Sequence, residues 1–388
     1  MFCNYEYPPL GGGGGVVMAA LARELARRHE VTVLTSQALS LPAASLDGEV
    51  KVLRAPVFFR RQLAVANLPS MLAYLPSGIV KGLGLLRASR FDIVNTHFVV
   101  PSGPLGHVLA RVAKIPNVLS VHGGDLFDPS KASSPHRHAW LRTPIRYLLN
   151  AADEVVGQSR DTVRHVAEIY HVRRPVELIP LGIERPPATE PSGTREKLGL
   201  PSGAFVMVTV GRLVARKSAA QLVQALATCA RADAHLVVVG DGPDSAALQS
   251  AAASAGVAQR VHLLGHVSDA IKYQALAAAD IFVSTSQHEG FGLVFLEAMA
   301  FGLPVICYDR GGQTDFLKSR ETGHVAPLND LADFTRAIVH LHDDPAVRRE
   351  IAQNNRQRVE DFFIDRCAER YEAVFAATCE RAARRVAK

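Results

Sequence analysis

The sequence predicts an α/β protein with two doubly wound, Rossmann-like domains that face each other across a cleft. Its 388 residues exceed one ordinary domain and suggest two, at roughly 100–200 residues each. Short β-branched runs alternate with longer amphipathic stretches, which is the pattern of successive βαβ units in a parallel sheet. A stretch dense in proline and glycine, residues 180–193, separates two such series and predicts a linker.

The first series begins with a glycine run, Gly11–Gly15, that leads into a predicted helix at Val16–Arg28. Only Met1–Tyr5 is left for a strand before this run, so we expect either a very short first strand or a truncated start. The other strands expected in this half are Val31–Thr35, Val50–Ala55, Ile93–Thr96, Val118–Val121, Glu154–Gly157 and Val176–Ile179.

The second series restarts after the linker and ends in a helical region rich in arginine and glutamate, from Ala332 onward. Its expected strands are Phe205–Val210, His235–Val239, Val261–Leu264, Ile281–Ser284 and Val305–Cys307. We expect domains at 1–183 and 184–365. Ligands of such sheets bind beyond the carboxyl ends of the strands, so residues that follow a strand are the candidates for function.

The net charge of +6 lies entirely in the first half of the chain. Residues 1–190 hold 21 basic and 15 acidic side chains, whereas residues 191–388 hold 22 of each. An excess of positive charge indicates an anionic partner, either a membrane surface or an acidic acceptor. A general solubilising bias of the surface stays open as the alternative.

Several features predict a cytoplasmic protein. No uninterrupted run of about 18 apolar residues predicts a membrane-spanning helix. Met1–Gly15 lacks the basic and apolar regions of a signal peptide. The five cysteines are scattered, with no CxxC motif or Cys/His cluster, so we expect reduced thiols and no zinc site.

Two segments carry residue types that bind phosphate. Gly11–Gly15 would let backbone N–H groups approach a ligand in front of a helix N-terminus, with a flexible turn as the alternative. Arg212 and Lys217 follow the strand Phe205–Val210, where a guanidinium and an ammonium suit a diphosphate and the charge that builds on a leaving phosphate. In isolation, the second segment is more typical of a solvated basic loop.

The most specific segment is the run EGFGLVFLEAMAFGLPVI, which begins at Glu289. Glu289 lies in a predicted loop, in which Gly290 and Gly292 leave backbone N–H groups bare. Glu297 follows about two turns later, in a helix that starts near Leu293. A helix N-terminus favours an anion, and a carboxylate inside that helix would bind ribose hydroxyls.

Two histidines follow strands of the first half. His122 comes directly after Val118–Val121, and His97 comes after Ile93–Thr96. A histidine at this place can donate a hydrogen bond to a substrate hydroxyl or act in proton transfer. A buried histidine that supports other residues is the alternative, and it is the stronger one for His97.

Together these motifs resemble the retaining glycosyltransferases of family 4, also called the glycosyltransferase group 1 family, which have the GT-B fold. The resemblance covers nearly the whole chain, and Glu289 and Glu297 in their EGFGL and EAMA setting are its most specific element. The other segments that carry it are Tyr7–Gly15, His122-Gly123, Ser159, Pro180–Ile183, Gly211–Lys217, Gly240–Pro243 and Gly311-Gly312.

The resemblance implies roles for these residues. His122 and Glu289 would be catalytic and lie beside the transferred sugar. The residues implied to bind the donor diphosphate are Gly12, Gly13, Arg212, Lys217, Gly292 and Leu293. The other implied contacts are Gly290 and Phe291 for the donor sugar, Glu297 for the ribose, and His266 and Val267 for the nucleobase.

Three positions depart from the family pattern. Gly15 stands where the family often has a glutamate, which affects the contacts expected for the acceptor. Ser218 replaces the glycine that usually follows the lysine, and Thr314-Asp315 replaces a Pro-Glu pair, which leaves a shorter carboxylate.

The implied reaction moves a hexose-type sugar from a UDP or GDP donor to a glycan or lipid-linked acceptor, with the anomeric configuration retained. We expect no cofactor and no divalent metal, because no DxD carboxylate pair follows a suitable strand. The resemblance also implies that a final helix, at about 366–388, packs back on the first domain.

Two other functions stay open: a sugar-nucleotide epimerase of similar fold, and a non-catalytic subunit that binds a nucleotide sugar. A nicotinamide-dependent enzyme is disfavoured, because no GxGxxG motif followed by an acidic residue is present. The partners expected are the donor and the acceptor, and no nucleic acid.

The stretch Phe58–Arg90 combines apolar and basic side chains, a composition that suits an anionic membrane surface. We therefore consider a peripheral contact with the inner face of the membrane. An ordinary pair of helices on the acceptor side is the alternative.

Overall fold

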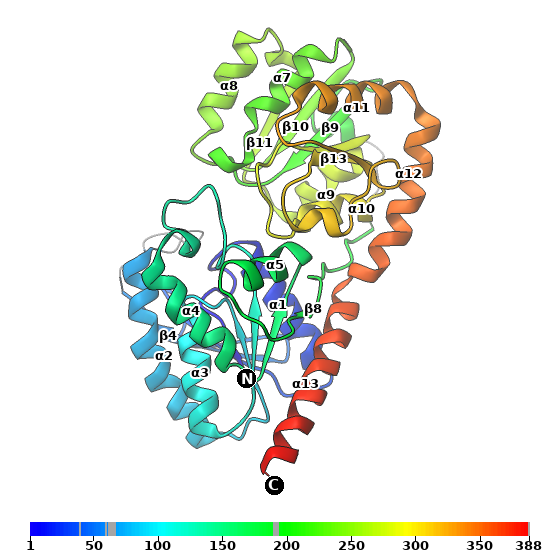
Figure 1. Ribbon diagram of the computed structural model, residues 1–388. Coiled ribbons are helices and arrows are strands. Elements are labelled where there is room, and N and C mark those ends of the chain that lie inside the picture. The colour runs from blue at the N-terminus through cyan, green and yellow to red at the C-terminus, as the bar shows by residue number, and fades with distance from the viewer. Residues whose placement is uncertain (39, 59, 61–66, 189–193, 387–388) are drawn as a thin grey trace. The chain divides into compact units, whose positions relative to one another are not determined.

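The computed structural model describes residues 1–38, 40–58, 60, 67–188 and 194–386. The chain divides into two compact units, which are Met1–Glu184 together with Phe362–Lys388, and Arg185–Asp361 (Figure 1). The unit boundaries therefore fall at 184/185 and 361/362, rather than at the expected 183/184 and 365/366. The C-terminal segment belongs to the first unit.

The first unit contains an eight-stranded sheet in the order β3-β4-β2-β1-β5-β6-β7-β8. Neighbouring strands are parallel, except that β3 runs antiparallel to β4. The strands are β1 (Phe2–Cys3), β2 (Thr32–Gln37), β3 (Ala44–Asp47), β4 (Val50–Pro56), β5 (Val94–His97), β6 (Asn117–Val121), β7 (Glu154–Gly157) and β8 (Glu177–Leu178).

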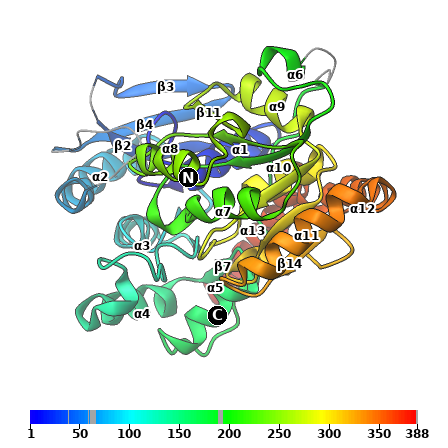
Figure 2. The same ribbon diagram turned by 90° about the horizontal axis from the view of Figure 1, so that it is seen from above.

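Helices cover both faces of this sheet (Figure 2). Helices α1 and α13 share one apolar cluster with the strands, and α2 and α3 contribute to another. Helix α4 packs with α5 in a third cluster. The helices are α1 (Gly13–Ala26), α2 (Leu68–Ala88), α3 (Ser102–Ala113), η1 (Pro135–Arg137), α4 (Ala139–Ala151), α5 (Arg160–Glu168) and α13 (Ile364–Val386).

The second unit contains a six-stranded, fully parallel sheet in the order β11-β10-β9-β12-β13-β14. Its strands are β9 (Phe205–Val210), β10 (Ala234–Val239), β11 (Val261–Gly265), β12 (Ile281–Ser284), β13 (Val305–Tyr308) and β14 (Gly323–Ala326).

One short helix of the second unit precedes β9, and the others fall in the intervals between its strands and after β14, as expected for a doubly wound sheet. They are α6 (Thr194–Lys197), η2 (Ala215–Lys217), α7 (Ala220–Thr228), α8 (Ser245–Ser254), η3 (Ala258–Arg260), α9 (Asp269–Ala278), α10 (Leu293–Ala300), η4 (Gly312–Asp315), α11 (Leu331–Asp343) and α12 (Pro345–Arg358). One further short helix, η5 (Val359–Phe362), spans the second unit boundary.

Every strand predicted from the sequence coincides with an observed strand to within two residues at each end. Strands β3 and β14 were missed, because both are short and neither has the fully buried apolar run of a central strand. The predicted start of α1 at Val16 was wrong, since the helix begins at Gly13. Glycine disfavours a helix, but a Cβ atom at Gly14 would lie 2.4 Å from Cζ of Phe98, so a side chain at this position would have to displace the ring of Phe98.

All five cysteines are unpaired, and four of them are buried. No helix in the described part of the chain is long and apolar enough to cross a membrane.

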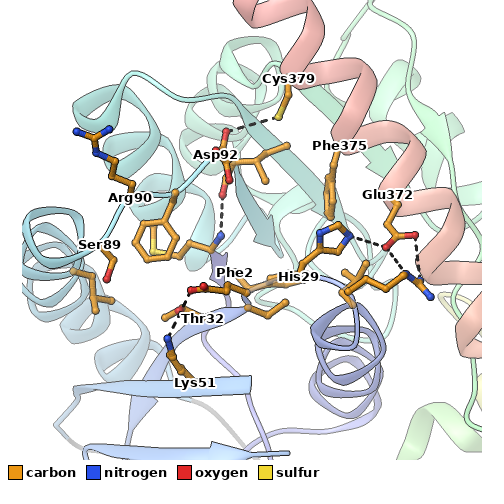
Figure 3. Close-up of a pocket in the computed structure, with 18 of the residues that line it drawn as sticks. Phe2, His29, Thr32, Lys51, Ser89, Arg90, Asp92, Glu372, Phe375 and Cys379 are labelled. Atoms are coloured by element: carbon orange, nitrogen blue, oxygen red, sulfur yellow. Dashed lines mark hydrogen bonds and ion pairs between the residues drawn. The ribbon is translucent and has the colours of Figure 1, made fainter. Parts of the chain in front are cut away.

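Helix α13 is anchored to the first unit by buried and charged contacts. The buried Tyr371 donates a hydrogen bond from its hydroxyl to Oγ of Ser120, which lies in β6, over 3.1 Å. At the surface, Glu372 accepts from Nε of Arg28 over 2.8 Å and lies 2.7 Å from Nε2 of His29 (Figure 3). Gly182 brings the chain close to the start of α13.

A cavity of about 700 Å³ lies beside these contacts (Figure 3). Its walls include Met1 and Phe2, Thr32 and Ile93, which stand at the amino ends of β1, β2 and β5. Ligands of parallel α/β sheets bind at the opposite, carboxyl edge. The candidate functional site therefore lies at the other edge of a sheet, away from this cavity.

The packing of α13 predicts that Gly182→Ala lowers the stability of the protein. The added Cβ atom would lie 2.8 Å from Cα of Ile364 and 2.9 Å from Cβ of Cys367, so the helix would have to shift. We expect a loss of about 1–3 kcal/mol in the free energy of unfolding, measured by denaturant titration. The control is Gly84→Ala on α2, where a Cβ atom meets nothing within 4 Å. Equal stability of the two variants would contradict this account of α13.

Candidate functional site

The candidate site of the second unit is formed by loops at the carboxyl ends of β9, β12 and β13. The loop after β9 includes η2 and ends in Lys217. It is tied to the loop after β12, because Oγ1 of Thr285 donates to the carbonyl of Ser218 over 2.9 Å and the N–H of Gln287 donates to the carbonyl of Arg216 over 2.8 Å. Adjacent parallel strands thus place the two predicted motifs side by side.

Glu289 is the centre of this arrangement. Its side chain is 9% exposed, and its two carboxylate oxygens bind different cations. Nζ of Lys217 lies 2.5 Å from Oε1, and Nη1 of Arg216 lies 3.2 Å from Oε2. Arg216 also donates to the carbonyl of His288. The structure thus brings Lys217 and Glu289 together, and it adds Arg216, which sequence reasoning did not single out.

The charge state of Glu289 follows from these contacts. Burial alone would raise the pKa of this carboxyl group. Lys217 and Arg216, with hydrogen bonds from Lys217 and Ser286, outweigh burial and lower the pKa to about 2. Glu289 is therefore an anion throughout the physiological pH range.

The backbone of Glu289 is held by the loop after β13. Its carbonyl accepts from the N–H of Gly312 over 2.9 Å, and its N–H donates to the carbonyl of Arg310 over 3.2 Å. Gly311 has a φ of 113°, and a Cβ atom there would lie 1.9 Å from the carbonyl oxygen of Glu289. Only glycine permits this close approach.

Helix α10 begins directly after this loop. Its N-cap, Gly292, has a φ of 96°. Glycine has no side chain, so Gly292 cannot accept hydrogen bonds from the first N–H groups of the helix through a side-chain atom. An uncapped helix N-terminus attracts an anion. Leu293, the first helical residue, is half-buried.

Glu297 lies on α10 and is paired with a residue that the sequence reading missed. Nζ of Lys272, on α9, lies 2.8 Å from Oε1 of Glu297 and 3.0 Å from a carboxylate oxygen of Asp269. Burial would lower the pKa of Lys272, but Glu297 and Asp269 reverse this effect and raise it. Lys272 therefore neutralises part of the charge of the predicted ribose-binding acid.

The other predicted residues of this unit differ in exposure. The side chain of Arg212 is exposed and has no hydrogen bond or ion pair with any residue that the structure describes. His266 is exposed and Val267 half-buried, directly after β11. Phe291 is buried, 5.2 Å from the ring of Phe316, so any sugar contact at this position must come from the backbone rather than from the ring.

In the first unit, the predicted His122 is buried beside His97. Nδ1 of His97 lies 2.9 Å from Nε2 of His122. The ring of Phe98 stacks on His122 at a centroid distance of 4.2 Å, and Phe98 has a φ of 67°, which is rare for a residue with a side chain. Burial lowers the pKa of His122 to about 3, so its ring is neutral. The carboxylate of Asp125 accepts from the backbone N–H of His122 over 2.9 Å.

The predicted glycine loop stands at the N-terminus of α1. Gly12 is the N-cap and Gly13 the first helical residue, and both are exposed. The N–H of Gly12 donates to the carboxylate of Glu6 over 3.4 Å. Glu6 thus brings a carboxylate to this loop. The family pattern often places a glutamate in the loop itself, at the position that Gly15 occupies here.

Two protein families match the chain. The family described as "Glycosyl transferases group 1" matches residues 193–358, and "Glycosyltransferase Family 4" matches residues 11–185. A 2-deoxystreptamine N-acetyl-D-glucosaminyltransferase from Streptomyces fradiae is 30% identical over 348 residues, which cover 84% of this chain and 81% of the relative.

Two solved structures resemble the fold. Sucrose-phosphate synthase from Thermosynechococcus elongatus has a TM-score of 0.83 and 24% identity, and the match covers 97% of this chain and 98% of that chain. HepE from Anabaena, in complex with UDP, has a TM-score of 0.78 and 20% identity, with 97% of this chain and 99% of that chain covered. At these identities the likeness shows the fold alone.

The ion cluster predicts that Glu289→Gln lowers stability at neutral pH, because Lys217 and Arg216 lose their shared anion. We expect a loss of about 1–3 kcal/mol in the free energy of unfolding at pH 7. The folded-state pKa lies below the ordinary value, so the contribution of Glu289 is present above about pH 4.5 and is lost as the pH falls toward 2. The difference in the free energy of unfolding between wild type and Glu289→Gln should therefore become smaller as the pH falls from about 4.5 toward 2.

The matched control is Glu321→Gln. Glu321 forms a surface ion pair with Arg358 over 3.0 Å and is 63% exposed, so its loss should change stability by less than about 0.5 kcal/mol at any pH. If Glu289→Gln lowers the free energy of unfolding by no more than Glu321→Gln does, the ion cluster contributes little to stability.

Proposed function

The chain belongs to the glycosyltransferase group 1 family, with the GT-B fold, and on this premise we propose that it is a retaining hexosyltransferase. It takes a hexose-type sugar from a nucleotide-sugar donor and transfers it to a glycan or lipid-linked acceptor. The observation that carries this proposal is the ion pair of Lys217 and Glu289, in the loops that follow β9 and β12, directly before the uncapped N-terminus of α10 at the carboxyl edge of the sheet of the second unit.

These groups are suited to a donor diphosphate. Arg212 is exposed and carries a guanidinium with no competing anion among the described residues. Lys217 is held in place by Glu289 and has further hydrogen-bond donors for phosphate oxygens. The N–H groups of Gly292 and Leu293 would add two neutral donors. In the first unit, Gly12 and Gly13 are exposed, and we propose that their backbone also contacts the donor diphosphate.

The remaining contacts of the donor follow from the same site. Glu297 would bind the ribose hydroxyls, and His266 with Val267 would contact the base. Glu289 and the backbone of Gly290 would contact the transferred sugar, with His122 as its partner from the first unit. UDP is the donor nucleotide we favour, because the related structure of HepE holds UDP.

In the proposed reaction, the bond between the anomeric carbon and the phosphate oxygen breaks while the acceptor oxygen bonds to that carbon from the same face. The acceptor proton passes to the leaving phosphate oxygen, so no base on the protein is needed. Arg212, Lys217 and the helix N-terminus stabilise the charge on the leaving group, which is the task that a divalent metal would otherwise perform. We propose that no metal is needed.

The two alternative functions differ in product. A sugar-nucleotide epimerase would convert the donor without an acceptor, and a non-catalytic subunit would bind the donor without transfer or hydrolysis. The complete set of Arg212, Lys217, Glu289 and Glu297 favours an enzyme that cleaves the donor.

We also propose that the enzyme is cytoplasmic and that it contacts the inner face of the membrane through helices α2, α3 and α4. Helix α2 packs against α3, and α3 against α4 (Figures 1 and 2). None of the three helices contains an acidic residue. Their basic residues are Lys81, Arg87, Arg111, Arg142 and Arg146.

The apolar side chains exposed on these helices are only in part those of the expected stretch, Phe58–Arg90. Most of the apolar residues of Phe58–Arg90, such as Leu75 and Leu83, pack on the core of the first unit, and residues 59 and 61–66 lie outside the described part. Those exposed by more than half are Leu72, Val80, Val112, Trp140 and Tyr147. Helix α4, which the sequence reading did not single out, thus offers two aromatic rings beside two arginines, a combination that suits a lipid headgroup region.

The donor site predicts a stabilising shift in thermal unfolding with one of UDP-, GDP-, ADP- or dTDP-linked sugars in the presence of a metal chelator. Lys217→Met and Arg212→Ala should each reduce sugar transfer by about 100-fold or more, since each removes a charge that stabilises the leaving phosphate. Lys197→Ala, an exposed lysine on α6, is the control and should transfer normally. Full activity of both site variants, or activity that disappears with the chelator, would contradict the proposed donor chemistry.

The surface of α4 predicts binding to vesicles that contain anionic lipid and none to neutral vesicles. Charge reversal in Arg142→Glu with Arg146→Glu should weaken binding to these vesicles by about 30-fold or more, measured by co-sedimentation, given roughly 1 kcal/mol for each basic residue near the surface. Arg349→Glu, an exposed position on α12, should bind like wild type. Wild-type protein that fails to sediment with anionic vesicles would refute the membrane contact.

A further inference from the structure

A chain of buried hydrogen bonds leads from helix α13 to His122. Four links join five side chains of the first unit. The hydroxyl of Tyr371 donates to Oγ of Ser120 over 3.1 Å, and Oγ of Ser120 donates to Oδ1 of Asn95 over 3.1 Å. Nδ2 of Asn95 lies 2.9 Å from Nε2 of His97, whose Nδ1 lies 2.9 Å from Nε2 of His122. All five residues are at most 8% exposed, so water does not compete for these bonds.

The direction of this chain determines where each proton lies. The amide nitrogen of Asn95 can only donate, so Nε2 of His97 must accept and carries no proton. Burial lowers the pKa of His97 well below its ordinary value, so the ring is neutral and its single proton lies on Nδ1. That N–H donates to Nε2 of His122, which must therefore accept. The one proton of a neutral His122 is then on Nδ1.

Nδ1 of His122 is buried and has no hydrogen-bond partner among the residues that the structure describes. A buried N–H group without a partner is costly, and native proteins rarely contain one without a reason. Phe98 covers a face of the imidazole ring, whereas a hydrogen bond to Nδ1 forms in the ring plane. An acceptor oxygen from a bound molecule would satisfy this group.

We propose that His97 is a positioning residue, which with Asn95, Ser120 and Tyr371 holds His122 in the tautomer that donates from Nδ1 to an oxygen of the transferred sugar. The inference rests on the proposed function and deepens it. His122 then acts as a neutral donor that orients the sugar, and it does not take the proton of the acceptor. This agrees with the transfer of that proton to the leaving phosphate.

The groups around His122 are consistent with a neutral donor. Its titratable neighbours are His97, which is neutral, and Asp125, which binds backbone N–H groups of Val99 and His122. Tyr371 at the far end of the chain is buried, and burial raises its pKa, so its hydroxyl keeps its proton. Neither neighbour draws the proton of His122 away from Nδ1.

The test reads the tautomer of His122 directly, by nitrogen NMR of the full-length protein labelled at histidine, with the signal assigned by its absence in His122→Asn. We expect a proton on Nδ1 and none on Nε2 in the wild-type protein. This measurement needs no turnover, so it is separate from the test of transferase activity. A wild-type His122 protonated on Nε2 would overturn the proposal.

Two variants at His97 separate positioning from packing. His97→Leu fills space but cannot donate, so His122 should shift toward the Nε2 tautomer and kcat/KM should fall about tenfold, which is the value of one uncharged hydrogen bond. His97→Asn places an amide N–H near the position of Nδ1 and should keep both the tautomer and most of the activity. UDP affinity should stay within about twofold of wild type in both. If the two variants lose the same amount of activity and the tautomer of His122 is unchanged in both, His97 contributes only packing and the proposal is wrong.

Discussion

The burial of one carboxylate, that of Glu289, is the constraint on which the site of the second unit depends. A carboxylate removed from water is unfavourable unless cations and hydrogen bonds replace its hydration. Lys217 and Arg216 supply the cations, and the loop that contains Gly311 holds the backbone. Three loops at the carboxyl edge of the sheet are therefore fixed around one charge. A lysine held in this way is positioned for phosphate before a donor arrives, which is the kind of preorganisation that lowers the barrier to charge build-up.

The site residues that belong to a recognisable sequence motif were predictable, but the residues that form ion pairs with them were not. Lys217 and Glu289 each follow a strand, and parallel strands bring such residues to one edge, so their proximity follows from the fold class. Arg216 was indistinguishable in sequence from a solvated basic residue, because nothing local shows that its side chain turns toward Glu289. Lys272 was missed for the same reason, since its pairing with Glu297 joins two helices that are separated by β12, over 25 positions of sequence.

The fold itself was largely predictable, because parallel strands buried on both faces show as continuous apolar runs. Strands β3 and β14 lack such runs, and α1 begins with glycines that propensity alone assigns to a loop. The hydrogen-bond chain that ends at His122 was beyond sequence reasoning as well. It joins Tyr371 to Ser120 over 251 positions, and only the docking of α13 on the first unit brings them together.

The proposed reaction transfers a sugar with retention, through a diphosphate leaving group held by protein cations. The most direct measurement is the anomeric configuration of the first product, read by proton NMR during turnover of an α-linked nucleotide sugar with a glycan acceptor and no added metal. We expect an α-linked product and release of the nucleoside diphosphate. A β-linked product, or a donor that is epimerised while the acceptor is left unchanged, would contradict it.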